Sequence, residues 1–157
     1  SLIKKNPLDM MIQKATELGI QKFIPILSER SIVRDMNTKR IEKIIVESSE
    51  QSNRISIPKI LKPESLNIFL QNFPKEGKII FCDINSNNSE LKNFVSKQNK
   101  KNPVCILIGP EGDFSEKERQ SIIDIDQCFS LSIASNILRA ETAAIAAISV
   151  VNFYLDS

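Results

Sequence analysis

The chain has 157 residues, of which 41% are hydrophobic and 25% are charged, an ordinary globular balance for one domain with a substantial core. Histidine is absent, which excludes Ser-His-Asp triads, Cys-His dyads, HExxH metalloproteases and the zinc deaminases that need a histidine ligand. A net charge of +2 gives no indication that this domain alone neutralises many phosphates.

Hydrophobic periodicity in the first half of the chain predicts helices that alternate with short β-prone segments. Pro7 suits the first turn of a helix, and Gly19 suits its end. Pro25 is typical of an edge strand or of the end of a strand. The elements predicted here are a helix over 7–18, a strand over 22–27, a helix over 38–52 and a short helix capped by Ser65.

The second half alternates buried strands with helices. Val104 to Ile108 is continuous and apolar, which is typical of a strand in a parallel sheet. Ser115 and Glu118 have the spacing of a capping box that opens a helix. The alternation predicts an α/β fold with a mainly parallel sheet and helices on both faces. The elements predicted here are strands over 78–82, 104–108 and 128–133, and helices over 91–95, from 115 and over 140–155.

No apolar stretch reaches the roughly 18 residues that a membrane span needs, and no signal-peptide pattern is visible, so we expect a cytoplasmic protein without membrane contact. The chain opens with Ser1 and not with Met, and we expect it to be part of a longer protein. The three cysteines, Cys82, Cys105 and Cys128, form no CxxC pair. They are expected to be reduced, partly buried thiols.

The segment Ile108 to Asp113 (IGPEGD) joins the clearest strand to the capped helix. Its two glycines let the backbone come close to a ligand, at the carboxyl edge where open α/β sheets bind ligands. It lacks the GK[ST] ending of a P-loop and does not have the GxGxxG pattern. Taken alone, the loop could equally be a tight turn that binds no ligand.

Two further segments place charged residues at helix ends. In Asn136 to Ala144 (NILRAETAA), Arg139 stands where the helix macrodipole disfavours a cation, which suggests an anionic partner. Glu141 has an ordinary stabilising role available at the same helix end. Glu50 to Arg54 (EQSNR) ends the second helix, and its alternative interpretation is a solvated last turn with a suitably placed cation.

Five segments, in order and at compatible spacing, resemble the SPOUT-superfamily methyltransferases that act on N3 of a uridine in 16S (small-subunit) ribosomal RNA. The sequence departs from the family pattern at Asp113, where Gly is usual, and at Ala134-Ser135-Asn136, where Gly-x-Arg is usual. Ala restricts positive φ, and the missing Arg removes a charge and a bidentate donor. The five segments are Gln13 to Gly19 (QKATELG), Ser28 to Ser31 (SERS), Glu50 to Arg54 (EQSNR), Ile108 to Gly112 (IGPEG) and Ile137 to Ala143 (ILRAETA).

The resemblance implies a C-terminal deep trefoil knot and S-adenosyl-L-methionine as the cofactor, with no metal. Arg139 is the expected catalytic residue that stabilises negative charge, and Glu141 is a candidate base. Arg54 is expected to reach RNA or the site across a homodimer interface. The cofactor is expected among three loops whose binding residues are Cys82, Asp83, Ile108, Gly109, Glu111, Gly112, Leu131, Ile133, Asn136, Ile137 and Leu138.

The resemblance also implies the small ribosomal subunit as a partner, and a family N-terminal RNA-binding domain that this chain lacks. Residues 1–157 are thus expected to be one SPOUT-type RNA methyltransferase domain. A SPOUT enzyme for another RNA, such as a tRNA ribose 2′-O-methyltransferase, and a non-catalytic RNA-binding domain remain as alternatives. The homodimer is expected to use the apolar C-terminal helix, with Ile145, Ile148, Val150, Val151, Phe153 and Tyr154.

Overall fold

The computed structural model describes residues 7–30, 36–84, 86, 91, 102–110 and 112–156. Of the helix predicted over 91–95, only Leu91 is described, and Glu111 also lies outside the described residues. The helices are α1 (Pro7–Glu17), α2 (Thr38–Gln51), α3 (Leu66–Asn72), α5 (Glu116–Ile123) and α6 (Ala140–Asp156). The strands are β1 (Lys22–Phe23), β2 (Ile26–Leu27), β3 (Lys59–Ile60), β4 (Glu64–Ser65), β5 (Lys78–Cys82), β6 (Val104–Leu107) and β7 (Cys128–Leu131).

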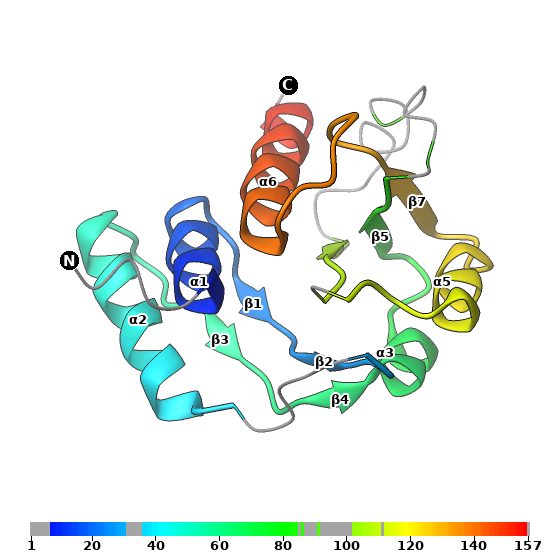
Figure 1. The fold of residues 1–157 in the computed structure, drawn as a ribbon. Helices are drawn as coiled ribbons and strands as arrows, with labels where there is room; N and C mark the ends of the chain where they lie inside the picture. Colours follow the sequence, from blue (N-terminus) through cyan, green and yellow to red (C-terminus); the bar gives the residue numbers. More distant parts are fainter. Residues whose placement is uncertain are drawn as a thin grey trace.

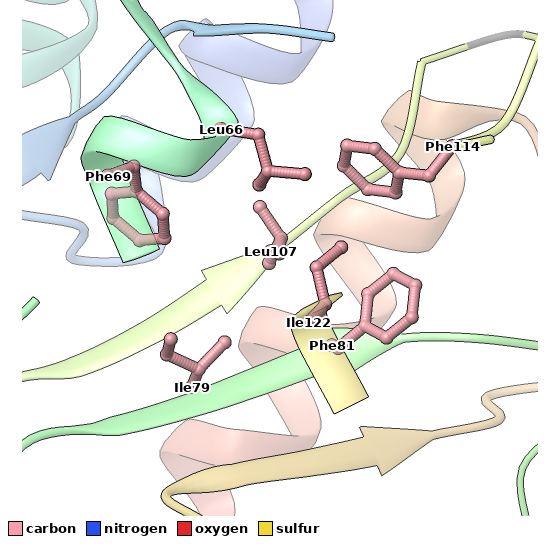
Figure 2. Close-up of a cluster of buried hydrophobic side chains, with 7 residues drawn as sticks. All are labelled: Leu66, Phe69, Ile79, Phe81, Leu107, Phe114 and Ile122. Atoms are coloured by element: carbon pink, nitrogen blue, oxygen red, sulfur yellow. The ribbon is translucent and has the colours of Figure 1, made fainter. Parts of the chain in front are cut away.

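The centre of the fold is a three-stranded parallel sheet in the order β6-β5-β7. Side chains alternate across a strand, so Ile79 and Phe81 point to one face of β5 and Ile80 points to the other. Helices cover both faces, as predicted. Ala147 and Val151 of α6 pack with Ile80. On the opposite face, β5 and β6 pack against α3, α5 and the loop before α5, in a cluster made of Leu66, Phe69, Ile79, Phe81, Leu107, Phe114 and Ile122 (Figure 2).

The strand predicted over 22–27 is divided in two, and so is its partner. β1 pairs with β3 and β2 pairs with β4, both in parallel. Phe23 is opposite Ile60 and Ile26 is opposite Glu64, so one chain advances three residues while the other advances four. The extra residue is a bulge, and proline at positions 25 and 63 supplies no N–H to the ladder there. Pro25 lies between the two short strands, which agrees with the strand end that this proline indicated.

The helices α1 and α2 form a second packed unit around Ile12, Ile41 and Ile45. Gly19 ends α1 in the left-handed conformation (φ +96°), as predicted for a C-terminal stop. Helix α6 lies between α1 and the central sheet (Figure 1), and the Asn152 side-chain amide donates a 2.8 Å hydrogen bond to the Leu18 carbonyl. Within the described part of the chain, no helix is long and apolar enough to cross a membrane.

Candidate functional site

The three predicted cofactor loops begin at one edge of the central sheet. Because β5, β6 and β7 are parallel, their carboxyl ends meet at that edge, where residues 82–83, 108–112 and 131–138 follow them. We call these ranges the strand-end segments. The Asp83 backbone N–H donates a 2.9 Å hydrogen bond to the Leu131 carbonyl, which joins the first segment to the third. The geometry therefore places at least these two segments side by side.

The second strand-end segment turns tightly, and Asp113, one of the family departures, fits the turn. Its φ is +57°, a left-handed conformation that Asp tolerates better than most residues. The Asp113 N–H donates to the Pro110 carbonyl at 2.9 Å, and its carboxylate accepts the Phe114 N–H at 2.8 Å. A Cβ atom added at Gly109 would lie 3.1 Å from Asp113 Oδ1, so this turn leaves little room for a side chain there.

The segment that contains Ser28, Glu29 and Arg30 is attached to the same turn. The predicted capping box at the start of α5 is present, with Glu118 accepting the Ser115 N–H at 3.0 Å. The same carboxylate accepts the Glu29 N–H at 2.8 Å, and Arg30 Nη1 donates to the Gly112 carbonyl at 3.2 Å. Two segments of the resemblance that are far apart in sequence are thus in contact.

Asp83 connects the central strand to α5 through an ion pair that the sequence analysis missed. Its side chain is 5% exposed, and its Oδ2 lies 2.7 Å from Arg119 Nη2. Arg119 Nη1 lies 3.6 Å from Glu116 Oε1. The hydrogen bond to Asp83 raises the pKa of Arg119 above its usual value. The guanidinium therefore stays charged beside the first strand-end segment.

The third strand-end segment leads from the core to an exposed helix start. Leu131 is buried and Ile133 packs on the cluster around Ile80, whereas Ile137 is 88% exposed. The Arg139 carbonyl accepts the Ala143 N–H at 2.9 Å, so Arg139 stands at the beginning of α6, as predicted. Its side chain is exposed, and among the described residues no ion pair links it to Glu141.

Arg54 lies at the other helical unit, where α1 and α2 end. Its Nη1 donates to the Thr16 carbonyl at 2.6 Å and to the Ile20 carbonyl at 2.8 Å. Asn53 takes a left-handed conformation (φ +54°), and the Arg54 N–H donates to the Ser49 carbonyl at 3.0 Å. The guanidinium therefore caps the C-terminal end of α1, where the helix dipole favours a cation. This contact joins the first and third segments of the resemblance.

A family of RNA methyltransferase domains matches residues 1–152. The chain belongs to this family. Two relatives are named Ribosomal RNA small subunit methyltransferase E: one from Rickettsia conorii, 35% identical over 151 residues, and one from Bacillus subtilis, 33% identical over 165 residues. The matches cover 95% and 99% of this methyltransferase domain but only 60% and 64% of the relatives' own lengths.

A solved structure supports the fold of the methyltransferase domain. It is the crystal structure of a Ribosomal RNA small subunit methyltransferase E from Neisseria gonorrhoeae bound to S-adenosyl methionine. The TM-score is 0.82 at 29% identity, and the match covers 96% of this chain and 62% of that one. The arrangement of parallel strands and flanking helices is therefore that of a known rRNA methyltransferase.

The cysteines of the methyltransferase domain are unpaired, as expected. Burial raises the pKa of Cys82 and of Cys105 to about 12, and that of Cys128 to about 11. All three thiols are therefore neutral near pH 7. Across the described residues, no group of three or more His, Cys, Asp and Glu side chains could hold a metal ion.

Proposed function

We propose that this chain is the catalytic domain of a cytoplasmic enzyme that transfers a methyl group from S-adenosyl-L-methionine to N3 of a uridine in 16S rRNA. One observation carries the proposal: the strand-end segments start from the same edge of a parallel sheet whose fold matches a methyltransferase bound to this cofactor. The family supports an RNA substrate. The names of the relatives support the small ribosomal subunit as the partner.

The strand-end segments suit a cofactor held mostly by backbone groups and apolar contacts. Gly109 leaves no side chain between the backbone and a ligand, and the neutral Cys82 thiol adds no charge. We propose the loops of a deep trefoil knot as the frame, with Asp83 contributing through its backbone. The proposed contacts come from Cys82, Asp83, Ile108, Gly109, Glu111, Gly112, Leu131, Ile133, Asn136, Ile137 and Leu138.

The cofactor, when bound, supplies an electrophilic methyl group on a sulfonium, so the chain must position the uridine and manage charge. N3 of uridine is a weak acid and must lose its proton as the new bond to carbon forms. Arg139 is exposed beside the first N–H groups of α6, which have no acceptor within the helix, and together they create positive potential for the resulting anion. Glu141, which has no ion pair to Arg139, is the proposed base.

Calorimetry with S-adenosylhomocysteine, the demethylated product, tests the cofactor part of this proposal. We expect a saturable heat signal and a higher melting temperature, because a ligand that binds only the folded state stabilises it. Methylation assays with 16S rRNA in small subunits and with tRNA then distinguish the substrates. Binding without methylation of any RNA would favour a non-catalytic RNA-binding domain, and tRNA ribose methylation would favour the other SPOUT alternative.

We further propose a homodimer that uses the outer face of α6. Ile148 and Val151 belong to the core, being 3% and 2% exposed, so they are not available to a partner. Val150 and Phe153 are 38% and 69% exposed and offer an apolar surface. We expect light scattering to give the mass of a dimer, and Phe153→Glu to shift it toward the monomer. A monomer mass for the wild-type chain at micromolar concentration would contradict the proposal.

Arg54 is the third proposed catalytic residue, acting on RNA or on the site of the partner copy through donors that α1 leaves unused. Mixed dimers test this role. In a dimer of one Arg139→Ala chain and one Arg54→Met chain, one of the two sites keeps both arginines if they come from different copies. Coexpression should then restore about a quarter of the wild-type rate, since half of the randomly formed dimers carry one intact site in two. No restoration, with both chains folded by circular dichroism, would show that Arg54 does not act across the interface.

A further inference from the structure

The ion pair between Asp83 and Arg119 lies where the first strand-end segment meets α5. Asp83 directly follows β5, and its backbone N–H is bonded to the Leu131 carbonyl at the start of the third segment. Its carboxylate is bonded to Arg119, in the first turns of α5. The second segment runs directly into α5 through the Ser115 cap. One residue thus connects, directly or through one helix, all three segments.

The ion pair between Asp83 and Arg119 is expected to add little to the stability of the fold. The Asp83 side chain is 5% exposed and that of Arg119 is 24% exposed, and removing these charges from water costs desolvation free energy that their attraction only partly offsets. Arg119 Nε is also buried without a hydrogen-bond partner among the described residues, which adds to that cost. What the ion pair provides is direction, because charged hydrogen bonds fix the relative placement of the groups they join.

We propose that Asp83 and Arg119 are positioning residues that hold the three strand-end segments in the arrangement that binds the cofactor. The inference rests on the proposed function, because it presupposes that these segments bind S-adenosyl-L-methionine. Asp83 acts through Arg119 and through its own N–H, since its carboxylate is turned to α5 and is 5% exposed. Arg119 was not among the residues that the sequence analysis selected.

The test compares S-adenosylhomocysteine affinity in Asp83→Asn, Arg119→Met and the double variant. We expect each single variant to bind about 10-fold more weakly or worse, because small displacements of binding groups are costly. The double variant should bind no more weakly than the singles, since both changes remove the same link. Asp9→Asn is the matched control, because it breaks the ion pair between Asp9 on α1 and Arg40 on α2. It should lower stability slightly and leave the affinity unchanged.

Circular dichroism confirms that each variant is folded at the temperature of the titration. If Arg119→Met does not fold, Arg119→Lys decides the question, because it keeps the charge and loses the planar fork. Affinity that is lower in the folded Lys variant supports the proposal, and wild-type affinity overturns it. If the wild-type chain binds and the Asn and Met variants bind equally well, the inference is wrong and the proposed function stands. If the wild-type chain does not bind, both are overturned.

Discussion

Replacing Arg54 by Met should destabilise the domain, because Arg54 holds the ends of two helices together. Its Nη1 atom donates to the carbonyls of Thr16 and Ile20, at 2.6 and 2.8 Å. The Thr16 carbonyl also accepts the Gly19 N–H at 3.1 Å, so the guanidinium adds a second donor there, and it reaches the Ile20 carbonyl just beyond the end of α1. Met keeps most of the apolar length of the side chain and removes the donors, so the change isolates the polar contact.

The magnitude follows from the two bonds. A hydrogen bond to a charged group contributes about 1.5–3 kcal/mol, and a cation at a helix C-terminus about 0.3–1 kcal/mol. The junction is only partly buried. Water therefore replaces part of the lost interaction, and we expect a loss of about 2–3 kcal/mol in the free energy of unfolding. For a domain of this size that corresponds to a melting temperature lower by roughly 5–10 °C.

Urea unfolding followed by far-ultraviolet circular dichroism measures this loss. Lys43→Met is the matched control, since Lys43 is on α2, is 77% exposed and makes a 3.7 Å surface ion pair with Glu47. It should change stability by less than about 0.5 kcal/mol. If Arg54→Met were no more destabilising than Lys43→Met, the capping role would be refuted. Arg54 would then be available for RNA alone.

Two further predictions concern the site and the thiols. The Arg139→Ala variant should fold and bind S-adenosylhomocysteine normally but turn over roughly 100-fold more slowly. Lys at this position should restore the rate only in part. A wild-type rate in Arg139→Ala would exclude a catalytic role for Arg139. Burial, with a smaller contribution from Cys128, raises the pKa of the Cys105 thiol from 9.0 to about 12. Above pH 9 the unfolded chain therefore loses this proton while the folded chain keeps it. The free energy of unfolding should then fall as the pH rises toward 12. Urea unfolding between pH 8 and 11 measures this effect. The free energy of unfolding should fall less steeply with pH in Cys105→Ala than in the wild type, by at most about 1.4 kcal/mol per pH unit. An unchanged slope would contradict the assignment.

Much of the fold could be predicted because its signals are local. The strand over 78–82, the Gly19 stop and the capping box at Ser115 each depend on residues within a few positions of one another. Pro25 indicated a strand end within 22–27, but the extra residue on the opposite chain, next to Pro63, depends on pairing with a segment far along the chain. The order β6-β5-β7 is likewise a property of distant pairing and has no signature in periodicity.

The same distinction applies to the site. The second strand-end segment was identified from its own glycines and the third from its position at a strand-to-helix junction, whereas the first was expected only from the family resemblance. The contacts between segments were missed, because Glu118 and Glu29 are 89 residues apart, and Arg119 and Asp83 are 36 residues apart. Nothing in a helix pattern says which distant carboxylate its arginine will meet. The departure at Asp113 proved harmless to the turn, since Asp tolerates the left-handed conformation that the position requires.

The positions of Arg139 and Arg54 connect the catalytic proposal to the dimer. Arg139 begins α6, and Asn152 of the same helix contacts the Leu18 carbonyl. At 1.5 Å per residue, these two points of α6 are about 20 Å apart. Arg54 binds the carbonyls on either side of Leu18 in sequence, and therefore lies at the far end of α6 from Arg139. Arginines so placed are poorly suited to one reacting uridine within a single copy. A catalytic role for Arg54 thus requires a second copy, whose site the apolar outer face of α6 would bring within reach.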